Sequence, residues 1–91
     1  MLEQINEPIE VIAKFVLLRQ GFGGQAGNKT IPVKFLWQGR EILVKKVNLA
    51  YSRWEGRSKF YFFAVSDSTN YFKLQFNSES LGWTLLETYT D

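Results

Sequence analysis

The clearest structural signal in the chain is the segment Val33-Lys34-Phe35-Leu36-Trp37-Gln38-Gly39-Arg40-Glu41-Ile42-Leu43-Val44. Apolar residues recur at every second position on both sides of Gln38-Gly39, a period typical of β-strands. A two-residue turn at Gln38-Gly39 would pair residue 37 with 40, 35 with 42 and 33 with 44. This register predicts a hairpin with one apolar face, formed by Val33, Phe35, Trp37, Ile42 and Val44. We take Phe35, Trp37, Gly39 and Arg40 as its structural residues, and expect Trp37 and Arg40 to be cross-strand neighbours that can stack.

Similar alternation extends outward from this hairpin. Residues 9–18 are rich in β-branched residues, which favours a strand, although Pro8 also suits the first turn of a short helix. After Val44 the apolar phase slips, which predicts a β-bulge near Lys45–Lys46. The polar residues 52–58 predict a turn or loop. The remaining expected strands are Lys59–Ser66 and Tyr71–Asn77, joined by residues 67–70, and Trp83–Tyr89.

These elements predict a mainly β fold, with about six antiparallel strands in a small meander that forms a barrel-like or rolled sheet. The strand at 59–66 is apolar on both faces and is expected to be central. A length of 91 residues corresponds to one domain, residues 1–91. The glycine-rich segment 20–28 is expected to be a flexible loop within it.

Composition excludes several kinds of active site. The chain has no Cys and no His, so tight zinc or copper sites and Cys–His or Ser–His nucleophilic pairs are ruled out. The glycine-rich segment lacks the strand–GxxxxGK–helix context of a phosphate loop. The candidate acids are dispersed over predicted strands and turns: Glu41, Glu55, Asp67, Glu79 and Glu87. We therefore expect no enzyme activity, no metal and no cofactor.

The segment 1–10 does not resemble a signal peptide, and the longest apolar run is too short to span a membrane. The absence of Cys favours a reducing compartment. The expected location is therefore the cytoplasm.

Charge is segregated along the sequence. Residues 29–59 contain eight basic and two acidic residues, a net charge of +6, whereas the rest of the chain carries −4. Basic side chains with interleaved aromatics are typical of small β-domains that bind single-stranded nucleic acid. The candidate nucleic-acid-binding residues are Lys45, Lys46, Tyr51, Arg53, Trp54, Arg57 and Lys59. The expected partner is single-stranded nucleic acid or a protein that handles it.

The alternative interpretation is that the lysines protect strand edges from aggregation. The domain would then be a protein-interaction module that accepts a peptide along an exposed strand edge. Salt separates the two hypotheses, because phosphate binding weakens steeply with ionic strength and edge pairing does not.

One pattern resembles a known family. It consists of Pro32-x-x-Phe35-x-Trp37-x-Gly39-Arg40, a following Val44 or Val47, the aromatic strand Tyr61, Phe62, Phe63, Val65, and Trp83-x-Leu85. Over residues 32–86 the chain resembles a family of small uncharacterised bacterial β-rich domains, some of them associated with proteins related to error-prone DNA polymerases. The resemblance implies a β-rich fold and a DNA-related context, but no activity that can be transferred to individual residues. The segment before Ile31 does not follow the family pattern.

Overall fold

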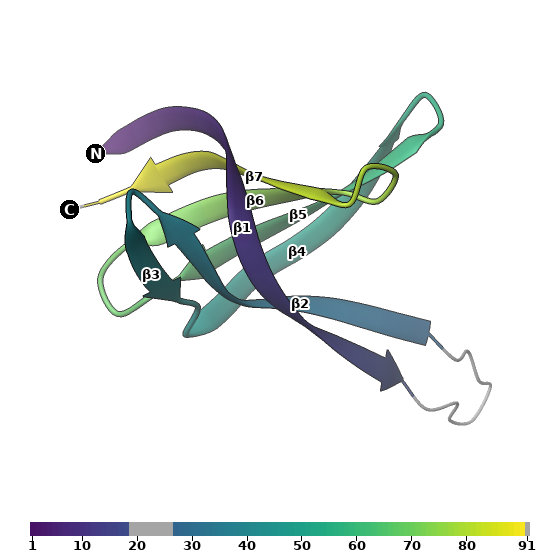
Figure 1. The fold of residues 1–91 in the computed structure, drawn as a ribbon, viewed down its shortest axis with the longest axis horizontal. Helices are drawn as coiled ribbons and strands as arrows, with labels where there is room; N and C mark the ends of the chain where they lie inside the picture. Colours follow the sequence, from purple (N-terminus) through teal and green to yellow (C-terminus); the bar gives the residue numbers. More distant parts are fainter. Residues whose placement is uncertain (19–26, 91) are drawn as a thin grey trace.

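The computed structural model describes residues 1–18 and 27–90, and over these residues the fold consists of antiparallel β-strands (Figure 1). The strands are β1 (Leu2–Leu18), β2 (Gly27–Trp37), β3 (Arg40–Leu43), β4 (Lys46–Glu55), β5 (Ser58–Ser66), β6 (Tyr71–Asn77) and β7 (Gly82–Tyr89). They form one sheet in the order β3-β2-β1-β7-β6-β5-β4. The sheet curls into a half-barrel, as the alternating sequence pattern predicts.

β1 connects the two halves of the curled sheet. Its first part pairs with β7 from Leu2 to Ile9, and its second part pairs with β2 from Glu10 to Leu18. The register between β1 and β7 shifts between Gln4 and Glu7, and Asn6 in this interval has a positive φ of 53°. Asn tolerates this backbone region better than most residues. The resulting irregularity lets β1 cross over β4–β7 and carry β2 and β3 with it (Figure 1).

The predicted hairpin is confirmed in its register. Phe35 pairs with Ile42 and Trp37 with Arg40. Gln38 and Gly39 both have positive φ, 52° and 72°, which is the backbone of a type I′ turn. The turn twists in the same sense as the flanking strands, so the hairpin closes without splaying.

One residue of that hairpin departs from the prediction. Val33 was expected on the apolar face but is 39% exposed, and Pro32 is buried in its place. Ile12 pairs with Lys34 and the next residue of β1, Ala13, pairs with Pro32, so Val33 is the extra residue of a β-bulge. Because of the bulge, the side chains of β2 before Lys34 point to the face opposite to the one that simple alternation predicts. Local alternation alone therefore misplaces Val33.

The segment from 52 to 58 is also corrected. It was expected to be a turn or loop, but β4 continues to Glu55 and β5 begins at Ser58, leaving a two-residue turn. Gly56 supplies the positive φ of 61° that this turn needs. The bulge expected near Lys45–Lys46 falls between Val47 and Leu49 instead. The chain leaves β3 at Leu43 and resumes as β4 at Lys46, on the opposite edge of the sheet, so seven strands are found where about six were expected.

Two further differences concern the N-terminal half. The first strand begins at Leu2 rather than Ile9, and the helical alternative at residues 6–8 is not formed. The expected glycine-rich loop, 20–28, lies outside the described residues up to position 26, whereas Gly27 and Asn28 already belong to β2.

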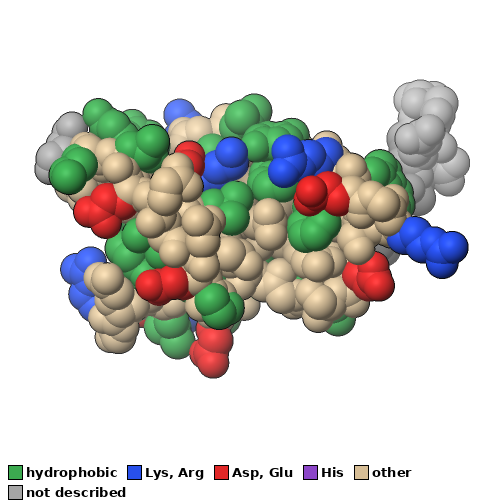
Figure 2. All heavy atoms as spheres, turned by 90° about the horizontal axis from the view of Figure 1, so that it is seen from above, with side chains coloured by type: hydrophobic (Ala, Val, Ile, Leu, Met, Phe, Trp, Pro, Cys, Tyr) green, Lys and Arg blue, Asp and Glu red, His purple; other side chains and the backbone are tan. Residues whose placement is uncertain are grey.

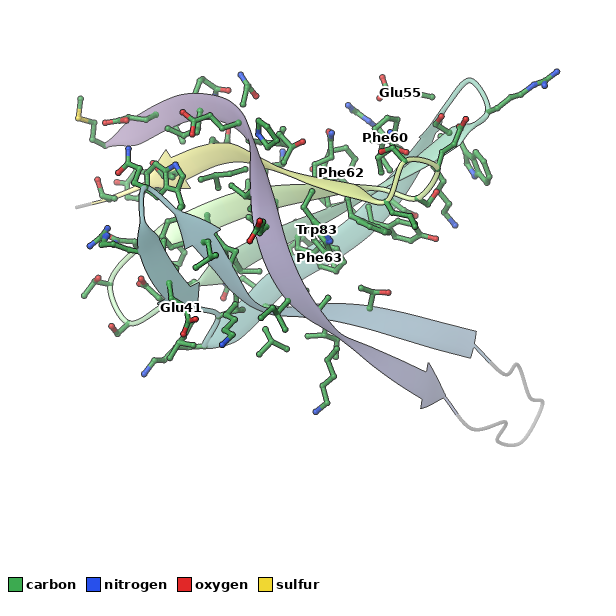
Figure 3. The ribbon with its side chains drawn as sticks, viewed as in Figure 1. Glu41, Glu55, Phe60, Phe62, Phe63 and Trp83 are labelled. Carbon is green, nitrogen blue, oxygen red and sulfur yellow. The ribbon has the colours of Figure 1, made fainter. Side chains whose placement is uncertain are left out.

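The core lies between the β2–β3 hairpin and the inner face of β5–β7. Its buried residues are Phe35, Ile42, Phe63, Val65, Phe72, Leu74 and Leu85. Phe35 meets Phe72 edge to face, with ring centroids 5.2 Å apart, and Phe63 packs beside Trp83 (Figure 3). Aromatic pairs in this geometry stabilise a small core beyond the area that they bury.

β5 is apolar on both faces, as predicted, because both faces are covered. Phe63 belongs to the core, whereas Phe62 points to the opposite, outer face and is nevertheless only 3% exposed. β5 pairs with β4 on one side and β6 on the other. The described residues include no helix long and apolar enough to cross a membrane.

Candidate interaction surfaces

The β4–β5 hairpin carries most of the candidate residues, but the two faces of the hairpin divide them. Tyr51 pairs with Phe62 across the hairpin, and Trp54 pairs with Lys59. Because neighbouring side chains on a strand point to opposite faces, Tyr51 and Arg53 share the outer face with Phe62. Trp54 and Lys59 lie on the inner face, the face that also bears the core.

The other three candidate cations are dispersed further. Arg57 occupies the turn beyond Glu55. Lys46 begins β4, at the other end of the strand. Lys45 lines a cleft of about 370 Å³ near Asp67 and Trp37. The face shown in Figure 2 likewise bears basic and acidic side chains interspersed rather than in separate areas. The five candidate cations therefore do not form one surface patch.

The outer face has a compact aromatic and basic cluster. The rings of Tyr51 and Phe62 are stacked, with centroids 5.0 Å apart and planes 15° from parallel. The guanidinium of Arg53 lies 4.9 Å from the centroid of the Phe62 ring, and the Lys73 ammonium lies 5.7 Å from that of Tyr51. Cations at these distances are attracted to the ring faces. They also cover Phe62, which accounts for its burial outside the core.

Sequence reasoning missed Lys73 in this cluster. Lys73 belongs to β6, in the net acidic part of the chain, so a search for runs of positive charge passes over it. The register of the second hairpin pairs it with Ala64, two residues from Phe62 and on the same face. That register was predictable from the alternation, and it is the signal that identifies Lys73.

The inner face has its own cation–aromatic group near the β4–β5 turn. The Lys59 ammonium lies 5.6 Å from the Trp54 ring centroid and 5.2 Å from that of Tyr61. Trp54 itself remains 65% exposed. A tryptophan this exposed at the end of a strand leaves a large apolar surface available for a contact.

Trp37 and Arg40 are cross-strand neighbours, as predicted, but they do not use the stacking that this arrangement permits. The cations found over aromatic rings in the described part of the chain are Arg53, Lys59 and Lys73. Trp37 instead lies edge-on to Phe72, at 6.3 Å between centroids. Trp37 therefore contributes to packing at one end of the core.

β4 is an edge strand. It has ten residues and pairs with β5 on one side, and no other strand of the described residues pairs with its outer edge. Every residue of β4 except Val47 is exposed. Long exposed edges with apolar side chains present unpaired backbone groups that can pair with another chain.

The β4–β5 turn establishes which backbone groups are free. Glu55 and Ser58 flank a two-residue turn. In such a turn, the two flanking residues form backbone hydrogen bonds with each other. Orientation alternates along an antiparallel ladder, so Arg53 and Tyr51 also direct their N–H and C=O groups toward β5. The corresponding groups of Ala50, Ser52 and Trp54 then point away from the sheet, along the free edge.

A cleft of about 270 Å³ adjoins the first half of this edge. Thr30 and Ile31 of β2 form one wall, and residues 47–50 of β4 with Phe63 form the other. The cleft marks the place where the half-barrel remains open between two strands that are not paired with each other. Toward the β4–β5 turn, β4 extends away from β2 (Figure 1).

The acidic residues do not form a cluster. Glu41 on β3 and Glu55 at the end of β4 are well separated (Figure 3). Glu41 forms an ion pair with Lys34 at 3.2 Å, and Glu79 accepts a hydrogen bond from the Ser58 hydroxyl at 2.6 Å. Within residues 1–18 and 27–90, no group of three acidic side chains is placed to hold a metal ion.

Comparison with known proteins found no matching family model, no similar curated protein and no similar solved structure. The resemblance carried by residues 32–86 therefore remains an expectation. The interaction surfaces themselves provide the basis for a functional proposal.

Proposed function

We propose that this domain is a non-enzymatic binding module that accepts an extended polypeptide strand along the free edge of β4. The observation that carries the proposal is the edge itself: β4 has ten residues, almost all with exposed side chains, and its outer edge pairs with no other strand of the described residues. A bound strand would gain backbone hydrogen bonds from the outward-directed groups of Ala50, Ser52 and Trp54.

Side-chain chemistry along β4 supports a peptide rather than a purely electrostatic partner. Leu49, Tyr51 and Trp54 are exposed along the edge; Leu49 and Tyr51 lie on its outer face, and Trp54 lies on its inner face. The candidate cations are divided between the faces, so they do not offer one continuous track for a phosphate backbone. An extended peptide with alternating side chains matches this arrangement.

The test is a titration with an alternating Thr-Val peptide of eight residues, followed by NMR. We expect the amides of Ala50, Ser52 and Trp54 to become protected from hydrogen exchange, with little dependence of the affinity on salt. The variant Ser52→Pro removes an outward N–H and should abolish binding while the domain stays folded, because edge positions of this kind tolerate proline. If the peptide protects none of the three amides, the proposal is wrong.

A second candidate function is binding of single-stranded nucleic acid on the outer face. The specific observation in its favour is the cluster of Tyr51, Phe62, Arg53 and Lys73, in which the two cations lie over a stacked pair of rings and the tyrosine is exposed. Exposed aromatics stack on bases, and nearby cations attract phosphates. This site would use Tyr51 and Arg53 of the predicted set, and Lys73, which was not in that set.

A further inference from the structure

The free edge of β4 is complementary to itself, and we propose that its partner is a second copy of this chain. In this arrangement, β4 of one copy pairs antiparallel with β4 of the other across a two-fold axis at Ser52. The inference rests on the proposed function, because it assigns the occupant of the same edge. Three features of β4 support both the partner and the register.

The first feature is the direction in which the free backbone N–H and C=O groups of β4 point. Ala50, Ser52 and Trp54 direct their N–H and C=O groups outward, by the alternation established from the β4–β5 turn. A two-fold axis at Ser52 places Ser52 opposite Ser52 of the second copy and Ala50 opposite Trp54 of the second copy. Every outward group in the range 50–54 then has a hydrogen-bond partner.

The second feature is the fit of a large side chain to a small one. Trp54 is exposed, whereas Ala50 has the smallest side chain on the same face of β4 and pairs with the core residue Phe63. Ala50 also lines the cleft of about 270 Å³ beside β2. Pairing about Ser52 would place each indole over Ala50 of the other copy, at that cleft, and would do so twice by symmetry.

The third feature is the set of side-chain contacts that the same register would form on the outer face. Tyr51 would lie opposite Arg53 of the second copy, in the closely spaced type of cross-strand pair. Each Arg53 could then contact a tyrosine ring of the other copy, a favourable contact for a guanidinium. Within one copy Arg53 already lies over the Phe62 ring.

Neighbouring registers lose these contacts. Moving the axis one residue toward the turn places Arg53 opposite Arg53, two like charges in direct apposition. Moving it one residue the other way places Trp54 opposite Asn48, within the β-bulge of β4. A larger shift in that direction would bring the second chain against β2 at Thr30 and Ile31, across the cleft.

The chain has no cysteine, so single-cysteine variants report the register without interference. In the proposed dimer, the two Ser52 Cα atoms would be about 5.5 Å apart, within the range that a disulfide spans. Under mild oxidation, Ser52→Cys should form a covalent dimer faster than Tyr51→Cys or Arg53→Cys. The matched control is Ser68→Cys, an exposed serine in the β5–β6 turn, which should remain monomeric.

Sedimentation equilibrium of the cysteine-free chain provides the independent measurement. We expect a reversible monomer–dimer equilibrium between micromolar and millimolar concentration. Trp54→Ala should weaken it by about tenfold or more, because a tryptophan buried at the centre of an interface contributes strongly. Circular dichroism should show that the variant keeps its β fold, since Trp54 is exposed in the single chain.

A chain that remains monomeric to millimolar concentration would overturn the second copy as partner. Preferential crosslinking through position 51, 53 or 68 would overturn the register. The alternating Thr-Val peptide keeps the two proposals distinguishable: peptide binding by a strictly monomeric chain refutes only the self-pairing. The opposite outcome is a chain that self-pairs but binds no peptide at protein concentrations below the dimer dissociation constant. That outcome refutes the proposal that the edge of β4 accepts peptide strands in general.

Discussion

Gly39 has a φ of 72°, and a Cβ atom at this position would meet no heavy atom within 4 Å. Any cost of a side chain here therefore comes from the backbone rather than from a steric clash. We expect Gly39→Val to lower the free energy of unfolding by more than about 1 kcal/mol, because a β-branched residue resists positive φ. Urea unfolding measures this change in the free energy of unfolding. Gln38→Asn is the matched control and should increase stability, because Asn-Gly is the preferred type I′ pair; unchanged stability of the valine variant would contradict the turn type.

Phe35 and Leu36 are adjacent in β2 but point to opposite faces of the hairpin. Phe35 is buried against Phe72, whereas Leu36 is 45% exposed. We expect Phe35→Ala to cost about 3–5 kcal/mol, as for a buried aromatic. Leu36→Ala should change stability by about 0.5 kcal/mol or less. Equal losses in the two variants, measured by thermal unfolding, would show that the predicted face assignment does not govern the energetics.

At the scale of a single element, β4 should show an alternating pattern of amide exchange. The amides of Tyr51 and Arg53 are directed toward β5 and should exchange slowly, whereas those of Ala50, Ser52 and Trp54 should exchange quickly. Hydrogen exchange followed by NMR at dilute protein concentration measures each amide separately. Uniform exchange along the strand would contradict the alternating direction of the backbone groups on which the proposed strand-binding surface depends. At high concentration, self-pairing should slow the three fast amides selectively.

The elements that sequence reasoning predicted well are those in which local and tertiary preferences agree. The Gln38-Gly39 hairpin is an example, because turn chemistry and alternation specify the same register. Val33 is a counterexample: its position depends on a bulge created by pairing with β1, which local alternation does not reveal. Residues 52–58 have the polar composition of a loop, but Gly56 alone suffices to turn the chain, so strand pairing continues on both sides of it.

The candidate site was less predictable for a reason that also concerns β4. Once residues 52–55 are recognised as strand, the period of two alone places Arg53 and Trp54 on opposite faces. Because these residues were expected to be a loop, the division of the cations between the two faces could not be foreseen. The edge position of β4 could not be predicted from local pattern, because it depends on the tertiary pairing of β1 with β7.

At the scale of the whole molecule, segregation of charge along the sequence does not become segregation in space. The pleat of β4 places its consecutive residues on opposite faces, and the pairing of β6 with β5 brings Lys73, from a net acidic part of the chain, to the outer cluster. Any binding of single-stranded nucleic acid should therefore depend on the face that a cation occupies, and not on its position within residues 29–59. This distinction can be measured with charge reversals on each face.

For binding of an oligothymidine on the outer face, we expect Arg53→Glu and Lys73→Glu each to weaken the complex, because Arg53 lies over the Phe62 ring and Lys73 lies over the rings of Tyr51 and Phe62. Lys59→Glu is the matched control, since Lys59 lies on the inner face beside Trp54 and Tyr61. If the two outer cations contact two phosphates, the slope of log K against log salt should be about −1.4, and about −0.7 after either reversal. Fluorescence anisotropy across a salt series measures both quantities. Equal weakening by Lys59→Glu would show that the outer cluster does not define the site. If no binding is detected at low salt, the second candidate function is excluded, and the edge of β4 is left as the proposed interaction surface.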